Sequence, residues 1–205
     1  MAHAAAVHSE NVMLQPSNRA AGAGVYNEKL GMWVFLGSEI MFFTALIGSY
    51  VILRFAHPDS WKAPGQVLNI PVTATNTFLL ICSSVTMVKA FAAAQDGIQR
   101  SLRLWLIATV LIGATFVGVQ VYEYAHLIEK GFIPSEGLYG TTFYTMTGFH
   151  GFHVTVGVIC MIFVTIRAFA GKYSATDYRG VEVIGLYWHF VDLVWIILFT
   201  IVYLM

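Results

Sequence analysis

The chain has 205 residues, of which 58% are hydrophobic and only 11% are charged, and its mean hydropathy is +0.70. A soluble domain carries about a quarter of its residues as charged ones, so this composition indicates an integral membrane protein. The formal net charge is zero, so no excess of one sign indicates nucleic acid or an acidic partner.

The first part of the chain, residues 1–29, is a polar tail. Its longest apolar run, Ala4 to Val7, is too short for the core of a secretory signal, so we expect the first membrane helix to direct insertion. The tail contains His3 and His8, but a metal-binding tract would need more histidines in close spacing. We expect the tail to be cytoplasmic and flexible.

Residues 30–205 form one transmembrane domain, because five stretches reach the roughly 20 apolar residues that a helix needs to cross a bilayer. These predicted helices are Leu30 to Leu53, Val72 to Ala94, Leu102 to Ala125, Thr141 to Phe169, and Val183 to Met205. Proline and glycine lie between them, and the connections are short. The sequence therefore predicts an all-α integral membrane protein built as a bundle of antiparallel helices.

The basic residues predict the orientation of the bundle. The tail and the second and fourth connections contain Arg19, Lys29, Lys89, Arg100, Arg103, Arg167, Lys172 and Arg179, whereas the other side has Arg54, Lys62 and Lys130. Lysine and arginine accumulate on the cytoplasmic side of membrane proteins. We therefore expect the N-terminus in the cytoplasm and the C-terminus outside, as for a multi-pass protein of a bacterial inner membrane.

Several ionisable side chains lie within the predicted helices, where each costs about 2.5 to 3.5 kcal/mol without a partner. Glu39 lies about nine residues into the first helix, roughly 14 Å deep, so we expect it to be protonated or hydrogen-bonded. His150 and His153 are three residues apart on the fourth helix, and His189 and Asp192 on the fifth, so each pair shares a face. We expect contact with Glu39, and we consider His150 and His153 its partners.

Three roles remain open for these groups. They could hydrogen-bond neighbouring helices, or serve a lipid or proton function. They could also bind zinc or iron, although neither pair is the Glu-x-x-His of ferritin-like proteins. Near the outer end of the third helix, Gln120 and Glu123 could face head groups or a neighbouring helix. The sequence contains none of the motifs that would hold a phosphate, a catalytic serine or covalent haem.

Four segments resemble subunit III of the haem-copper respiratory oxidases, in the family's order: LGSEIMFF, VQVYEYAH, LYGTTFYTMTGFHGFHVTVG and GLYWHFVDLVWIILFTIVYL. The resemblance covers about Leu30 to Met205 and favours the family's five-helix form. It implies an accessory subunit in an aerobic terminal oxidase, which reduces oxygen to water and pumps protons. The resemblance also implies a V-shaped cleft filled with phospholipid.

The resemblance also assigns partners and residues. It implies association with the catalytic subunit I and with subunit II, which would hold the haems and copper, while this chain would hold no cofactor except bound phospholipids. Cytochrome c or quinol would supply electrons, and we favour cytochrome c. Glu39 matches the family's carbodiimide-reactive glutamate, and a lipid phosphate is plausible at Arg167. The other residues in register with family motifs are His150, His153, Glu182, His189 and Asp192.

Two other functions remain open at this stage. A related small protein associated with nitric oxide reduction also resembles this fold, and its genes lie with denitrification genes. A free-standing metal or proton transporter would follow from the ionisable cluster alone. These alternatives predict different partners, since the transporter would act without haem-containing subunits.

Overall fold

The computed structural model describes residues 25–61, 68–135 and 137–204, and within them it contains five long antiparallel helices. These are α2 (Asn27–Ala56), α4 (Ile70–Gln95), α5 (Gln99–Glu129), α6 (Gly137–Phe169) and α7 (Arg179–Phe199). The short helix η2 (Pro58–Ser60) follows α2, and the π-helical segment η3 (Thr200–Leu204) continues α7. Each of the five is long and apolar enough to cross a membrane, which confirms the predicted helix bundle.

The helices extend a few residues beyond the predicted apolar stretches. Asn27, Glu28 and Lys29, which we expected in the tail, form the first turn of α2. Polar residues continue a helix at no desolvation cost where its end emerges into the head-group region, so hydropathy alone underestimates helix length. Val25 and Tyr26 precede the helix, and the rest of the expected tail, residues 1–24, lies outside the described residues.

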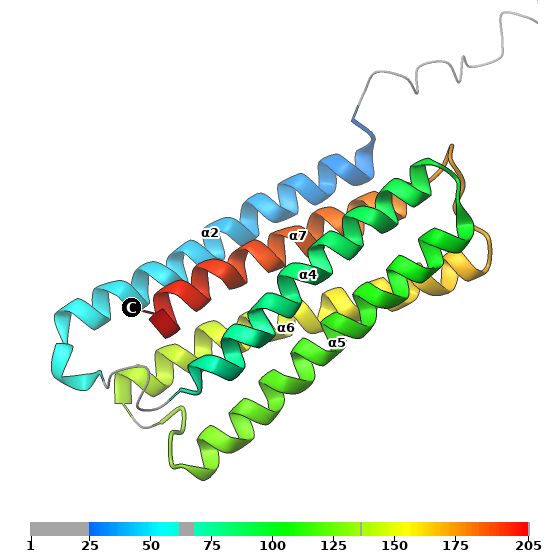
Figure 1. Ribbon diagram of the computed structural model, residues 1–205. Helices are drawn as coiled ribbons and strands as arrows, with labels where there is room; N and C mark the ends of the chain where they lie inside the picture. The colour runs from blue at the N-terminus through cyan, green and yellow to red at the C-terminus, as the bar shows by residue number, and fades with distance from the viewer. Residues whose placement is uncertain (1–24, 62–67, 136, 205) are drawn as a thin grey trace, which may run out of the picture.

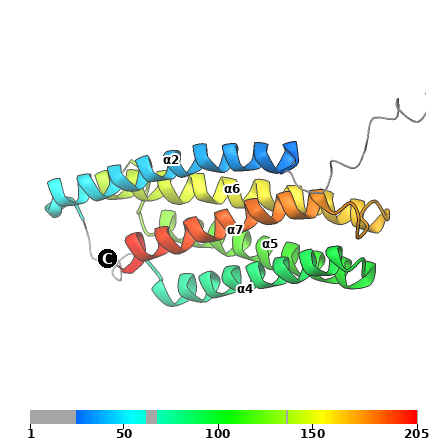
Figure 2. The same ribbon diagram turned by 90° about the horizontal axis from the view of Figure 1, so that it is seen from above.

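The bundle has two ends, which we call the N-end, where α2 begins, and the C-end, where η3 ends. Figures 1 and 2 show α7 between α2 on one side and α4 on the other, with α5 and α6 completing the bundle. α7 packs on α2, α4 and α6, whereas α2 packs on α7 and, less extensively, on α6. α2 is therefore attached to one side of a more compact group formed by the other four helices.

Glycines end the helices at the N-end where the sequence predicted breaks. Gly97 has φ 72°, and its neighbour Ile98 donates a backbone hydrogen bond to Ala93 O at 2.9 Å. This left-handed backbone is accessible to glycine without a Cβ clash, and it satisfies carbonyl groups at the end of α4. Gly171, with φ 67°, follows α6 in the same way. The turns hold α4 next to α5 and α6 next to α7.

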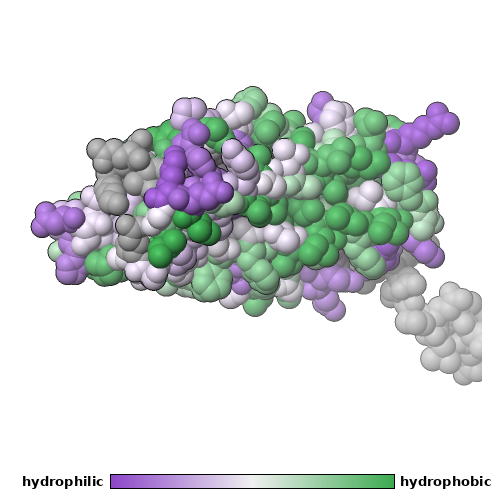
Figure 3. All heavy atoms as spheres, turned by 90° about the horizontal axis from the view of Figure 1, so that it is seen from below, coloured by the Kyte–Doolittle hydropathy of each residue, from purple (hydrophilic) through white to green (hydrophobic). Residues whose placement is uncertain are grey.

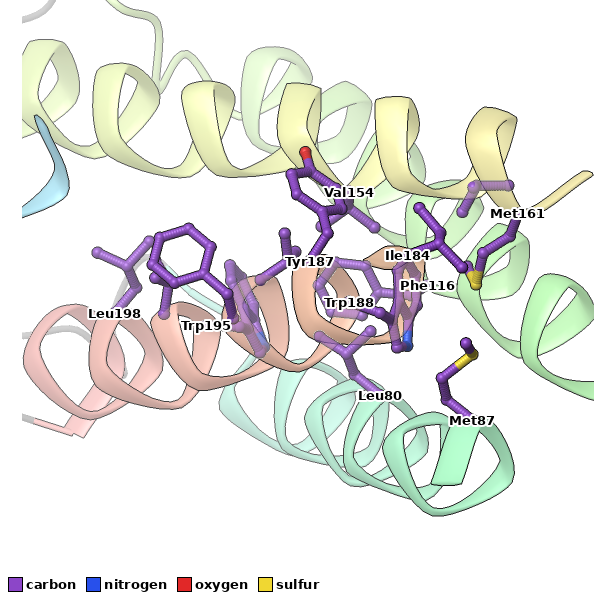
Figure 4. Close-up of a cluster of buried hydrophobic side chains, with 14 of the residues drawn as sticks. Leu80, Met87, Phe116, Val154, Met161, Ile184, Tyr187, Trp188, Trp195 and Leu198 are labelled. Atoms are coloured by element: carbon purple, nitrogen blue, oxygen red, sulfur yellow. The ribbon is translucent and has the colours of Figure 1, made fainter. Parts of the chain in front are cut away.

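The packed centre of the bundle is built on α7 (Figure 4). Trp188 and Trp195 are buried, and their indole N–H groups donate to Ser83 Oγ and Thr77 Oγ1 on α4, each at 2.9 Å. These hydrogen bonds satisfy the polar atoms of two large side chains away from water. They also fix the register of α7 against α4.

Outside this centre, the surface is apolar along the middle and polar towards the ends. Figure 3 shows hydrophobic residues over much of the central part of one face, with hydrophilic residues gathered towards both ends. Large exposed apolar side chains such as Met41, Phe55 and Leu104 contribute to this surface. An apolar belt of this kind is what contact with lipid chains requires, since no charge is then exposed at membrane depth.

Candidate functional site

Polar contacts attach α2 to the bundle at its N-end. Lys29 Nζ lies 2.5 Å from Glu182 Oε1 on α7, and Tyr26 donates from its hydroxyl to Glu182 Oε2 at 2.7 Å. Glu182, one of the residues selected from the sequence, is therefore bound by two groups of the α2 N-terminus. Burial and the nearby Glu182 carboxylate together raise the pKa of Tyr26. We call Tyr26, Lys29 and Glu182 the N-end clasp.

A second contact lies deeper in the membrane. His153 Nε2 is 3.1 Å from Glu39 Oε2, so the expected pairing of Glu39 with His153 is confirmed. His153 Nδ1 lies 2.7 Å from the carbonyl oxygen of Phe149, which can only accept a hydrogen bond. Nδ1 must therefore carry a proton, and a second proton is shared between Nε2 and the carboxyl group.

The shared proton keeps the Glu39–His153 pair neutral overall. Either the carboxylic acid donates to a neutral ring, or a carboxylate accepts from an imidazolium, and the two forms have the same net charge. Aromatic rings surround the pair, with the Phe43 ring centroid 5.2 Å and the Phe152 centroid 5.8 Å from that of His153. This arrangement explains how a carboxyl group is tolerated at this depth.

The expectation that His150 also contacts Glu39 is wrong. His150 is fully buried and points towards α7, where Nε2 hydrogen-bonds to the carbonyl of Val191 at 3.1 Å. Its ring stacks on Trp195 with centroids 4.7 Å apart. Residues three apart on a helix differ by about 60° in direction, which is enough for two histidines to contact different helices. His150 therefore joins α6 to α7.

The remaining pair lies between α7 and α4. His189 Nδ1 is 2.6 Å from Ser84 Oγ. Ser84 also interacts with the carboxyl group of Asp192, whose Oδ1 has no hydrogen-bond partner among the described residues. The sequence-selected groups thus lie at separate helix contacts. In the described part of the chain, no three His, Cys, Asp or Glu side chains come together as a metal ion would require.

Arg167 lies at the N-end, at a cavity of about 680 Å³ between α2, α6 and α7. Lys172 and Arg179 also line it, and the other lining side chains are mainly apolar, including Met32, Ile159, Phe163, Val183 and Ile184. Arg179 is paired with Glu28 at 3.5 Å and with Asp177 at 3.1 Å. Arg167 and Lys172 form no salt bridge with any described residue. The carboxyl groups of Glu28 and Asp177 also line the cavity, and Asp177 lies close enough to Arg167 for their charges to interact. The three cations outnumber these two carboxyl groups, so the cavity can still attract an anion.

Near the C-end, Glu123 and Gln120 face neighbouring helices rather than head groups. Thr73 on α4 donates from its hydroxyl to Glu123 Oε1 at 2.7 Å, and Gln120 Nε2 donates to the carbonyl of Thr147 on α6 at 3.0 Å. Both side chains are buried. α5 is therefore joined by buried polar contacts to α4 and α6, and this resolves the two alternatives that the sequence left open.

Comparison with known proteins identifies the family. The family model described as "Cytochrome c oxidase subunit III" matches residues 7–205. The chain belongs to this family. A probable cytochrome c oxidase subunit 3 from Nocardia farcinica is 39% identical over 174 residues, which cover 85% of this chain and 86% of the relative.

Other relatives include both oxidase types. Cytochrome c oxidase subunit 3 of Thermostichus vulcanus is 39% identical over 177 residues, covering 86% of each chain. A probable quinol oxidase subunit 3 from Staphylococcus haemolyticus is 34% identical over 179 residues, covering 86% of this chain and 88% of the relative. As a subunit III, this multi-pass membrane protein is an accessory subunit of a haem-copper terminal oxidase.

Sequence reasoning missed the neutral partners of the charged groups in this subunit III. Tyr26 and Ser84 were not selected, although each contacts a selected residue from another helix. Serine and tyrosine are common in membrane helices, and no spacing distinguishes those that face a neighbour. Thr73, the partner of Glu123, was missed for the same reason. Only the tertiary arrangement identifies these residues.

Proposed function

We propose that the N-end cavity binds the phosphate of a phospholipid head group, and that this lipid helps to stabilise the terminal oxidase and to supply it with protons and oxygen. The observation that carries the proposal is that Arg167 and Lys172, which form no salt bridge with any described residue, lie beside an apolar cavity wall. Exposed cations at the edge of an apolar groove match a lipid that has an anionic head and apolar chains.

The surroundings of Arg167 favour a head group at this position. Its guanidinium lies 5.9 Å from the ring centroid of Phe163 and 5.8 Å from that of Tyr173. These contacts orient the planar cation while leaving its N–H groups available for phosphate oxygens. Acyl chains bound below it would lie between α2 and α6 and extend towards the Glu39–His153 pair. Such a site would correspond to the lipid-filled cleft that the family resemblance implies.

The arrangement in the cell is part of the same proposal. We place the N-end at the cytoplasmic face of a bacterial inner membrane, because Lys89, Arg100, Arg103 and the cavity cations lie there, whereas Arg54 and Lys130 lie at the C-end. The catalytic subunit I and subunit II would hold the haems and copper. We propose cytochrome c as the electron donor, since the relatives named cytochrome c oxidase share a higher identity with this chain than the quinol oxidase relative.

Lipid retention tests the cavity assignment. The complex that contains the double variant Arg167→Gln, Lys172→Gln should be purified in mild detergent beside the unsubstituted complex. The phospholipids bound to each complex are then quantified by mass spectrometry. We expect at least one anionic phospholipid per complex to be lost. Arg100→Gln is the matched control, because this exposed cation lies at the same end but does not line the cavity. Equal lipid retention in all three preparations would contradict the proposal.

Purification from the native membrane tests the assembly. The chain should co-purify with haem-containing subunits whose optical spectrum reports the haem types, and a copper centre in subunit II would support cytochrome c as donor. Removal of the chain should leave oxygen reduction measurable in the remaining complex. Isolation of the chain without any haem subunit would contradict its proposed partners.

A further inference from the structure

A groove along α7 carries hydrogen-bonding groups that nothing in the described structure satisfies. Its lining residues come from α7 and from the two helices on either side of it, α4 and α2, and Figure 1 shows α7 between these two helices. Two cavities of about 240 and 350 Å³ lie along this groove, and His189 lines both. We call it the α7 groove.

The first unsatisfied group is the His189 ring. Nδ1 contacts Ser84, but no described residue hydrogen-bonds to Nε2, and the side chain is only half-buried. His189 lies ten residues from the start of α7, which corresponds to about 15 Å and hence to the middle of the bilayer. Acyl chains have no group that could satisfy an imidazole nitrogen at that depth.

The second group is the Thr44 hydroxyl on α2. Every other threonine in the five helices and η3 has its hydroxyl within hydrogen-bond distance of a backbone carbonyl of the preceding turn. Thr44 has no hydrogen bond to any described residue, is exposed, and lines the α7 groove together with His189. Thr44 lies within the apolar run MFFTALIG, in the hydrocarbon region of the bilayer, so water is not available as a hydrogen-bond partner for its hydroxyl.

Asp192, which follows on α7, is 6% exposed and lines neither of the two cavities. Glu182, His189 and Asp192 are spaced by seven and three residues, so they lie along one side of the helix. Glu182 is satisfied by the N-end clasp, whereas Asp192 has an unpaired oxygen beside Ser84. The Asp192 oxygen is buried, so the accessible unsatisfied groups of the groove are His189 on α7 and Thr44 on α2.

We infer that the α7 groove binds a transmembrane helix of another oxidase subunit, which presents hydroxyl or amide side chains to His189 and Thr44. A polypeptide can supply such groups at the bilayer midplane, whereas the polar groups of a phospholipid lie at the membrane surfaces. Leu186 and Leu193 provide an otherwise apolar floor on which a helix can pack. The inference rests on the proposed function only in taking the partner from the oxidase complex.

Photocrosslinking in the intact complex tests this interface. A photoreactive phenylalanine analogue replaces Leu193 in the groove or, as the control, Leu111 on α5, because these two side chains are 56% and 62% exposed. We expect irradiated membranes to give a crosslink between position 193 and a second oxidase subunit. Crosslinks from position 193 to lipid or to a second copy alone, or an equal yield of the same protein crosslink from position 111, would overturn the inference. Co-purification of the chain with haem-containing subunits is measured separately, so that failure of this interface can be distinguished from failure of the proposed function.

A second measurement examines the hydrogen bonds themselves. His189→Leu should lower the detergent concentration at which the subunit dissociates from the complex, whereas His189→Gln should restore retention, since an amide can replace the imidazole as a hydrogen-bonding group. The thermal unfolding of each isolated variant reports whether the bundle itself is intact. Equal retention of the Leu and Gln variants, with both bundles folded, would overturn the role of His189 in binding the partner.

Discussion

Gly113 and Trp188 are in such close contact that a methyl group on Gly113 would lie 2.7 Å from the Cη2 atom of the tryptophan. We therefore expect Gly113→Ala to destabilise the bundle by about 1 to 3 kcal/mol, because the Trp188 ring is buried and cannot move without disturbing α4 and α6. The measurement is the thermal unfolding midpoint in mild detergent. Gly118→Ala on the same helix is the control, since nothing lies within 4 Å of its new methyl group. Equal midpoints would contradict the packing described.

Glu39 should react with a hydrophobic carbodiimide. These reagents attack the neutral acid, which is one of the two forms of the Glu39–His153 pair, and the Glu39 side chain is 17% exposed towards the membrane. Glu123 is the internal control, because its carboxyl group is buried between α4 and α5. Mass spectrometry of peptides would locate the label. Modification of Glu123 with Glu39 untouched would contradict the arrangement.

Glu39→Gln should block this labelling while preserving the fold. An amide can still hydrogen-bond to His153 Nε2, but it cannot take part in the shared proton. We expect a modest loss of bound lipid or of sustained turnover in the complex, measured against the unmodified protein. A variant unchanged in both assays would assign Glu39 to helix packing alone.

The N-end clasp should contribute to the free energy of unfolding. We expect Lys29→Met and Glu182→Gln to show a coupling energy of about 0.5 to 1 kcal/mol in a double-mutant cycle, because the ion pair is only partly buried and is screened accordingly. Unfolding in mixed micelles at low and high salt measures it, and the coupling should decrease with salt. Strict additivity of the two substitutions would show that the contact adds no stability.

The loop between α6 and α7 should depend on pH through Asp177. Its hydrogen bond to Arg179 lowers the pKa of this carboxyl group below the ordinary value of 3.8. The stabilisation is therefore complete above that ordinary value and is lost as the pH falls through the lower value of the folded state. Hydrogen exchange in the loop should be faster in Asp177→Asn than in the unsubstituted chain at pH 6, and the two should converge in strong acid. A difference that persists below pH 2 would contradict this assignment.

Much of the fold could be predicted from the sequence, because lipid leaves few options for a long apolar stretch. Glu39 stands in a run that must be helical to satisfy its backbone, whatever its neighbours are. The turn at Gly97 was predictable for a similar reason, since a local left-handed conformation depends on one residue. Structural features that depend only on a few consecutive residues could therefore be predicted from the sequence.

The polar contacts were only partly predictable, because they depend on the rotation of one helix against another. His150 and His153 share a helix face, yet one contacts α7 and the other α2. The open hydroxyl of Thr44 was not predictable either, since it differs from the other threonines only in its surroundings. Hydropathy reports how deep a residue lies but gives no information on which neighbour it meets.

The loose attachment of α2 has a consequence for biosynthesis. Within α2 only Phe43 and Tyr50 are buried, and its polar partners His153 and Glu182 follow Glu39 and Lys29 by 114 and 153 positions. A ribosome adds about 5 to 20 residues per second, so α2 waits in the membrane for several seconds before its partners are synthesised. During that interval Glu39 has no histidine with which to share a proton, and the protonated acid is the form that the bilayer tolerates. Insertion of the first helix and its docking are thus separate events, and the position of α2 cannot become fixed before α7 has been synthesised.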